Sequence, residues 1–192
     1  LSTPIKHIDI KTFNAIPLIE AFDHMAFQSR NLANACKIYQ TMLTDQDCSI
    51  ILCLAGSLVS AGLKNVIVDM IRYHMIDAIV STGAIVVDQD FFEGLGFQHY
   101  RGEVRVDDSK LQKIHIDRIY DTFIDEDDLR VCDMTTKEIA DALPPRPYSS
   151  REFIYEMGKH LDTHGKNPDS FVLEAYHQEV PIFCPAFSDS SA

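Results

Sequence analysis

The chain has 192 residues and a formal net charge of −12, and hydrophobic residues make up 46% of the sequence. This length and hydrophobic content suit a single domain with a buried core. An acidic chain is short of the Lys and Arg clusters that bind phosphates, which argues against nucleic acid and anionic membrane surfaces as partners. No apolar run approaches the roughly 20 residues that cross a bilayer, and no signal peptide is recognisable.

The cysteines and the one close histidine pair have ordinary explanations. Five cysteines without a CxxC spacing predict reduced thiols, mostly in the core, and hence a cytoplasmic protein. His160 and His164 are spaced i, i+4 on a predicted helix, but no third ligand lies nearby in the sequence. We interpret them as surface histidines and predict no metal site.

The first half of the chain alternates between helical and strand patterns. The expected elements are, in chain order, helical residues 16–43, a strand at 49–54, a helix at 58–74, a strand at 77–81 and a helix from about 84 to 94. Polar residues 28–31 interrupt the first pattern, which predicts either two helices or a kink. Strand and helix alternating with short connections imply parallel strands joined by right-handed crossovers. The sequence therefore predicts an α/β fold with a doubly wound sheet.

Residues 96–131 depart from this alternation because they are polar and carry acidic runs. We expect a polar excursion within one domain spanning 1–192, with a short helix near 117–123. The acidic run 125–128 lacks the ligand spacing of a calcium loop and is interpreted as a solvated loop. The remaining expected elements are helices at about 135–143, 149–163 and 169–177 and a strand at 181–184.

Each of the two strands predicted in the first half is followed by small residues that lead into a helix. These residues are Gly56, Ser57 and Ser60 after the first strand, and Thr82, Gly83 and Ala84 after the second. A small residue lets the backbone approach a phosphate, and the following helix offers free N–H groups and the positive end of its dipole. Ligands of such sheets bind at the carboxyl ends of the strands, so the pattern favours a nucleotide cleft. Ordinary packing of strand against helix is the alternative, because no full GxGxxG pattern or Walker lysine is present.

Three aspartates lie close to these strand ends. Asp88 and Asp90 lie just inside the helix that begins near Ala84. They either complement the helix dipole or point into the cleft, where a carboxylate would hold an amine or a ribose hydroxyl. Asp189 follows the last predicted strand, and its place at a carboxyl end favours a binding role.

Several motifs occur in the order seen in deoxyhypusine synthases. They are the segments Phe27–Leu32, Gly56–Gly62, Val80–Ala84 and Val180–Asp189. The segments Phe91–Gly96 and Tyr100–Glu103 resemble the archaeal and bacterial deoxyhypusine synthase-like branch. The chain is similar to this family over nearly all of its length.

The resemblance implies an NAD-dependent transferase on a Rossmann-like fold with a mostly parallel sheet and helices on both faces. Members are usually homotetramers whose active sites are shared between subunits. In that family NAD oxidises spermidine, and the aminobutyl group passes through a lysine imine to a lysine of a translation initiation factor. By resemblance, the residues that contact NAD are Gly56, Ser57, Ser60, Thr82, Gly83, Ala84 and Asp189, and the residue that contacts the polyamine substrate is Asp88.

Two features of the sequence depart from the family pattern. Where eukaryotic members carry paired glutamates that hold the polyamine, this chain has Val87 and Asp88. Two alternatives therefore stay open. One is a homospermidine synthase-like transferase that uses agmatine or another polyamine with a small-molecule acceptor; the other is a non-catalytic subunit that pairs with a catalytic paralogue.

Family members also continue for about as long again. The resemblance places the glycine-rich NAD segment, the substrate histidine and the imine-forming lysine in that second half. We therefore expect this chain to be an N-terminal portion without the catalytic lysine.

Overall fold

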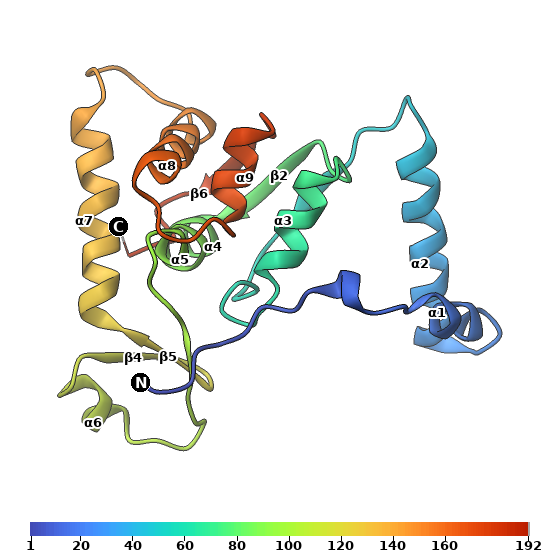
Figure 1. Ribbon diagram of the computed structural model, residues 1–192, viewed down its shortest axis with the longest axis horizontal. Helices are drawn as coiled ribbons and strands as arrows, with labels where there is room; N and C mark the ends of the chain where they lie inside the picture. Colours follow the sequence, from blue (N-terminus) through green and yellow to red (C-terminus); the bar gives the residue numbers. More distant parts are fainter. Residues whose placement is uncertain (192) are drawn as a thin grey trace.

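The computed structural model describes residues 1–191 as a body of strands and helices with a two-helix arm at one side (Figure 1). The arm consists of α1 (Ile16–Asp23) and α2 (Phe27–Thr44), so the helical stretch predicted at 16–43 forms two helices. The break lies at residues 24–26 and not at the polar residues 28–31, which belong to the first turns of α2. Residues 1–13, which we call the N-terminal strap, run along the body to the arm (Figure 1). Within the strap, Ile10–Thr12 form a single 3-10 turn, η1.

Three parallel strands form the sheet that the sequence predicts. They are β1 (Ile51–Cys53), β2 (Ala78–Thr82) and β6 (Ile182–Ala186), in the order β1-β2-β6. Ile79 in the central strand is fully buried and lies opposite Ile182, which is also buried. Because neighbouring strands run in the same direction, their carboxyl ends meet at one edge. The α/β fold with a parallel sheet is confirmed, and the doubly wound arrangement stays a prediction.

Helix α3 (Lys64–Arg72) begins later than the helix predicted at 58–74. Residues 56–62 instead form turns that start and end at glycines with positive φ, +81° at Gly56 and +93° at Gly62. Only glycine adopts these angles without strain, so the chain cannot continue as a helix through them. The prediction was wrong here because the apolar spacing of residues 59–63 continues that of the helix.

One continuous buried helix follows β2 and runs through the core. It consists of α4 (Gly83–Ile85), a π-helical segment η2 (Val86–Phe91) and α5 (Phe92–Gly94), and we call it the central helix. It matches the helix predicted from about 84 to 94. Its buried side chains form the middle of the hydrophobic core, to which α3, α7, α8 and α9 also contribute. The fully buried hydrophobic residues of the central helix are Ile85, Val86, Val87, Phe91 and Phe92.

Helices α7 (Glu126–Ala142), α8 (Ser150–His164) and α9 (Phe171–His177) complete the body. The prediction of a helix at 135–143 missed the first half of α7. The side chain of Asp125 caps this helix by accepting hydrogen bonds from the backbone N–H groups of Asp127 and Asp128. The acidic run is therefore a helix start, where carboxylates complement the dipole, and not a solvated loop.

The start of α8 is as the sequence predicts. Ser149 and Glu152 form a capping box in which each side chain accepts a hydrogen bond from the other residue's backbone N–H, at 3.2 Å and 2.9 Å. Glu152 also pairs with Arg146 at 3.0 Å. These contacts lower the pKa of Glu152 to about 2, with the bond from the Ser149 backbone contributing most.

The polar excursion folds into a small antiparallel sheet in the order β3-β5-β4. Its elements are β3 (Tyr100–Arg101), α6 (Asp108–Gln112), β4 (Ile116–Ile119) and β5 (Thr122–Asp125). The short helix predicted near 117–123 is wrong, because a turn with Tyr120 at a φ of +54° joins two strands there. Isoleucines and threonine in these strands favour the extended conformation.

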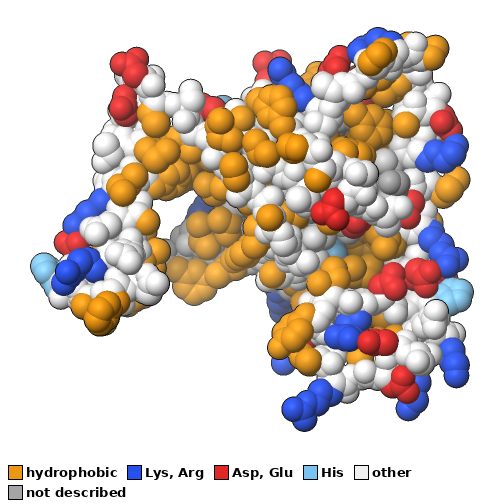
Figure 2. Space-filling view, turned by 180° about the vertical axis from the view of Figure 1, so that it is seen from behind, with side chains coloured by type: hydrophobic (Ala, Val, Ile, Leu, Met, Phe, Trp, Pro, Cys, Tyr) orange, Lys and Arg blue, Asp and Glu red, His pale blue; other side chains and the backbone are white. Residues whose placement is uncertain are grey.

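The arm exposes much of its apolar surface. Ala33 is its only buried residue, and Phe27 is 88% exposed. Figure 2 shows hydrophobic side chains along the hollow between the arm and the body. The other large exposed hydrophobic residues of α1 and α2 are Ile16, Leu18, Leu32, Ile38 and Leu43.

The cysteines are all free in the described residues, but fewer are buried than the sequence led us to expect. Cys132 and Cys184 are buried, whereas Cys36 and Cys53 are exposed. Among residues 1–191, no helix combines the length and hydrophobicity that crossing a membrane requires.

Candidate functional site

The structure brings the second strand-end loop against the segment that follows β6. A Cβ atom added at Gly83 would lie 2.3 Å from the carbonyl oxygen of Phe187 and 2.9 Å from that of Asp189. The pairing of β2 with β6 also shifts register between Val80 and Thr82, just before this loop. The predicted residues Thr82, Gly83 and Asp189 therefore lie at one edge of the sheet.

The first strand-end loop lies at the same edge because β1 pairs with β2. Gly56 is exposed, and among the described residues no atom other than those of Gly56 and its two chain neighbours lies within 4 Å of the position of an added Cβ. The backbone N–H of Ser60 donates to the side-chain oxygen of Gln89 at 3.1 Å, which ties this loop to the central helix. Sequence reasoning missed Gln89, since a single glutamine within a helix carries no spacing signal.

Asp88 faces the end of the described chain and not the interior. Its carboxylate accepts hydrogen bonds from the backbone N–H of Ser191 at 3.1 Å and from the Ser191 hydroxyl at 3.0 Å. The same hydroxyl lies 2.6 Å from a carboxylate oxygen of Asp133 on α7. Asp133 is a second residue that the sequence did not reveal, because α7 was expected to start after it.

The electrostatics around Asp88 favour a cation. Partial burial raises the pKa of Asp88 to about 6, and the nearby charges of Asp133 and Asp189 add to this rise while the bonds from Ser191 oppose it. A positive group placed beside Asp88 and Asp133 would reverse the effect and stabilise both carboxylates. This corner of the sheet edge is suited to an amine.

Asp90 has a structural role that excludes it from the cleft. Its fully buried carboxylate accepts hydrogen bonds from the Ser170 hydroxyl at 2.6 Å and from the backbone N–H groups of Phe171 and Val172, both at 2.9 Å. It therefore satisfies free N–H groups at the start of α9. Burial raises the pKa of Asp90 to about 6, although Lys64 and these hydrogen bonds oppose the rise.

The site fits a dinucleotide at its first loop better than at its second. The hydroxyls of Ser60 and Ser81 are buried at the strand ends and lack a hydrogen-bond partner among the described residues. Gly56 leaves space for a ligand to approach the backbone. At Gly83, in contrast, the chain's own segment 187–190 occupies the space that a side chain would need. Packing within the protein therefore accounts for this glycine, which is the alternative that the sequence left open. Ser57, Thr82 and Ala84 are half-buried, and Asp189 is exposed.

Other candidate sites lie apart from this edge. A cavity of ≈ 700 Å³ lies between α8, α9 and the start of β6, at the opposite end of that strand from Asp189. His160 and His164 stack on α8 with ring centroids 4.6 Å apart. Within residues 1–191 no group of three or more His, Cys, Asp or Glu side chains is placed to hold a metal ion.

The fold and this edge define an α/β protein whose candidate site is built from the carboxyl ends of parallel strands. Comparison with known proteins makes the class specific. A family model described as deoxyhypusine synthase matches residues 17–192. The chain therefore belongs to the deoxyhypusine synthase family, as its motifs led us to expect.

Named relatives support this assignment. The chain is 58% identical over 192 residues to a deoxyhypusine synthase-like protein of Chlorobaculum parvum, covering 100% of this chain and 55% of that protein. It is 55% identical over 193 residues to a deoxyhypusine synthase-like protein of Coxiella burnetii, covering 100% of this chain and 55% of that protein. It is 40% identical over 190 residues to a probable deoxyhypusine synthase 2 of Methanosarcina mazei, covering 99% of this chain and 55% of that protein. The chain thus spans about half the length of these curated relatives.

The fold is also shared with a solved structure. A putative deoxyhypusine synthase from Entamoeba histolytica matches with a TM-score of 0.66 at 20% identity, covering 97% of this chain and 63% of that one. At this identity the likeness concerns the fold.

Proposed function

We propose that the chain forms the cofactor-binding part of an NAD-dependent deoxyhypusine synthase-like transferase. The activity proposed is transfer of an aminobutyl group from spermidine to a lysine of a translation initiation factor. The observation that carries the proposal is the meeting of loops 56–62 and 82–84 at one sheet edge, with Asp88 beside them. Family membership supplies the reaction class.

In this proposal NAD lies along the first loop. Gly56 gives its phosphates access to the backbone, and the hydroxyls of Ser60 and Ser81, which have no hydrogen-bond partner within residues 1–191, provide donors for it. Ser57, Thr82, Gly83, Ala84 and Asp189 complete the set of proposed contacts. When bound, NAD supplies a hydride acceptor for oxidation of the amine.

Asp88 is proposed to hold a positive nitrogen of the amine substrate. Val87, which stands where the resemblance expects a glutamate, is fully buried in the core and does not contribute a charge. Asp133 provides a second carboxylate from a different helix. This altered pair supports a second candidate function, in which the enzyme uses agmatine or another polyamine and a small-molecule acceptor.

The assembly proposed is a homotetramer in the cytoplasm. The exposed apolar side chains of the arm support contact with other subunits, because a lone protomer would leave a large apolar surface in water. A Rossmann-like doubly wound sheet would require further strands beside β1 or β6, and we assign these to the rest of the full-length protein.

The test uses the full-length protein and compares substrates directly. Turnover is measured with spermidine, putrescine and agmatine, each with and without the translation initiation factor, together with NAD binding. Transfer to the factor supports the first function, and activity on free amines alone supports the second. The variant Asp88→Asn should lose amine affinity but keep NAD binding, whereas the exposed control Asp141→Asn should keep both. A wild-type protein that binds no NAD would refute both functions.

A further inference from the structure

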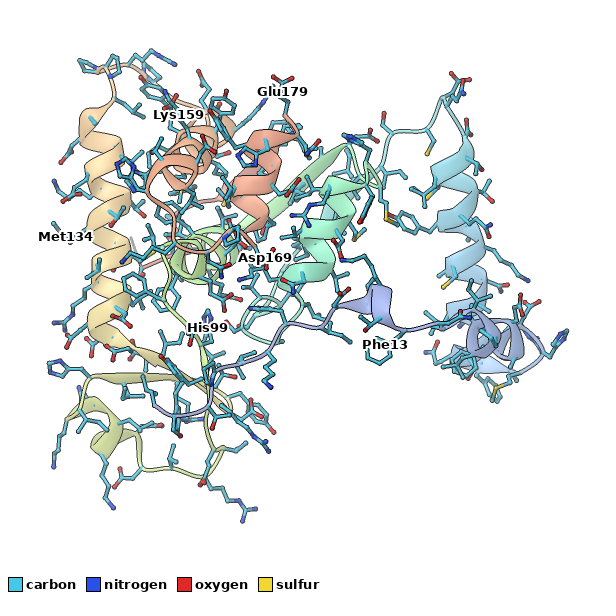
Figure 3. The ribbon with its side chains drawn as sticks, in the orientation of Figure 1. Phe13, His99, Met134, Lys159, Asp169 and Glu179 are labelled. Carbon is cyan, nitrogen blue, oxygen red and sulfur yellow. The ribbon has the colours of Figure 1, made fainter. Side chains whose placement is uncertain are left out.

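A buried polar cluster lies beneath the N-terminal strap and outside the site described above. Glu93 of the central helix lies at its centre, with its carboxylate 2.5 Å from the Lys64 ammonium, 2.6 Å from the His7 ring and 2.7 Å from the His99 ring. The four side chains are between 0% and 12% exposed. Burial opposes ionisation of Glu93, but its contacts with His7, His99 and Lys64 outweigh this and hold its pKa well below the usual range. Figure 3 shows His99 where the strap passes the body.

His7 connects this cluster to the start of α3. The backbone N–H of Lys64 donates to Nδ1 of His7 at 3.3 Å, so Nδ1 is an acceptor and Nε2 carries the hydrogen that faces Glu93. The ring thus bridges the first residue of α3 and the central helix. Both contacts are long-range, across 57 and 86 residues of sequence.

The rest of the strap is fastened to the far end of the loop 56–62. The backbone N–H of Ile8 donates to the carbonyl of Gly62 at 3.0 Å. A Cβ atom at Gly62 would lie 2.9 Å from the carbonyl oxygen of Lys6, so the glycine permits this close approach. On the other side, the N–H of Ile5 donates to the carbonyl of His99 at 2.8 Å. The strap therefore holds one end of the loop while Gln89 holds its middle.

We propose that His7 is a positioning residue for the loop 56–62, which it fixes for the binding of a dinucleotide. The identity of the ligand rests on the proposed function, whereas the effect of His7 on the conformation of the loop does not. His7 contacts neither the loop's exposed glycine nor Asp88, and it acts through Glu93 and the start of α3. Without its ring, the Lys64 N–H loses its acceptor and the strap loses its buried anchor.

Two substitutions of similar size separate hydrogen bonding from packing. His7→Gln keeps a donor for Glu93, whereas His7→Leu fills the space without polar contacts. The matched control is His177→Gln, which alters an exposed pair between His177 and Asp162 at 2.8 Å. In the full-length protein we measure amide hydrogen exchange of residues 56–66, the NAD dissociation constant and the unfolding midpoint.

We expect His7→Leu to speed exchange in residues 56–66 and to weaken NAD binding by about tenfold each, with His7→Gln within about threefold of wild type. The control should change neither. Unchanged exchange in His7→Leu would overturn the positioning role, whether or not the protein binds NAD. Equal losses in His7→Gln and His7→Leu would also overturn it, because packing alone would then explain them. If exchange responds as expected but wild type binds no NAD, the proposed cofactor fails and the positioning of the loop stands.

Discussion

The buried carboxylate of Asp90 allows a quantitative prediction about pH. Burial raises its pKa in the folded protein to about 6, from 3.8 for an ordinary aspartate. Since the folded state binds the proton more tightly than the unfolded state, the contribution of Asp90 to stability falls as pH rises from about 4 to 6 and is constant above that. A difference of about two pKa units corresponds to about 3 kcal/mol.

The variant Asp90→Asn removes this titration and keeps a side chain of the same shape. The amide carries donor and acceptor groups as a neutral carboxyl does, so it resembles the protonated form that Asp90 takes at pH 4. We therefore expect the variant to be within about 1 kcal/mol of wild type at pH 4 and to gain about 3 kcal/mol relative to wild type between pH 4 and pH 7.

The assay is urea unfolding of wild type and variant at pH 4, 5, 6 and 7. The pH dependence of the difference between the two unfolding free energies reports the titration of Asp90 alone, because all other titrating groups are common to both proteins. Asp141→Asn, an exposed change on α7, should give a nearly constant difference. A constant difference for Asp90→Asn would refute the reasoning, since it would show that Asp90 ionises in the folded protein as it does in the unfolded chain.

Three further substitutions test other contacts by urea unfolding at neutral pH. Gly83→Ala should destabilise by about 1–3 kcal/mol, because its Cβ meets backbone carbonyls that cannot easily move, and unchanged stability would contradict this contact. Glu93→Gln should cost about 3–5 kcal/mol because it removes the carboxylate that pairs directly with the buried ammonium of Lys64; a loss below about 1 kcal/mol would contradict the pairing. Ser149→Ala should cost about 1 kcal/mol through loss of the cap of α8, and no change would show that the capping box contributes nothing.

The parts of the fold that followed from the sequence are those in which local pattern and final structure agree. The apolar segments before residues 56 and 83 form β-strands, and the helix predicted from about 84 to 94 forms. The sequence pattern misplaced the starts of two helices, where single residues determine the backbone conformation. Positive φ at Gly56 and Gly62 delays α3, and Asp125 starts α7 earlier than its apolar spacing indicates.

The candidate site could be predicted only as far as it is local. Small residues after a strand are visible in the sequence, so both loops were found. The partners that complete the site are distant along the chain: Gln89 is 29 residues from Ser60, and Ser191 links Asp88 to Asp133 across 103 and 58 residues. Asp90 is the opposite case. Its position in the sequence was compatible with ligand binding, but its hydrogen bonds with the start of α9 show that it caps that helix.

The π-helical segment Val86–Phe91 has a consequence for how the central helix directs its aspartates. A π-helical turn accommodates one more residue than an α-helical turn, so such a segment behaves as a one-residue insertion within a helix. Deleting one residue there would rotate every preceding side chain by about 100° relative to those that follow, because each residue of an α-helix turns the chain by that angle. Asp88 and Asp90 would then no longer face the sheet edge and α9 together. The extra residue of this segment is therefore what lets one short helix present Asp88 to Ser191 and Asp90 to the start of α9.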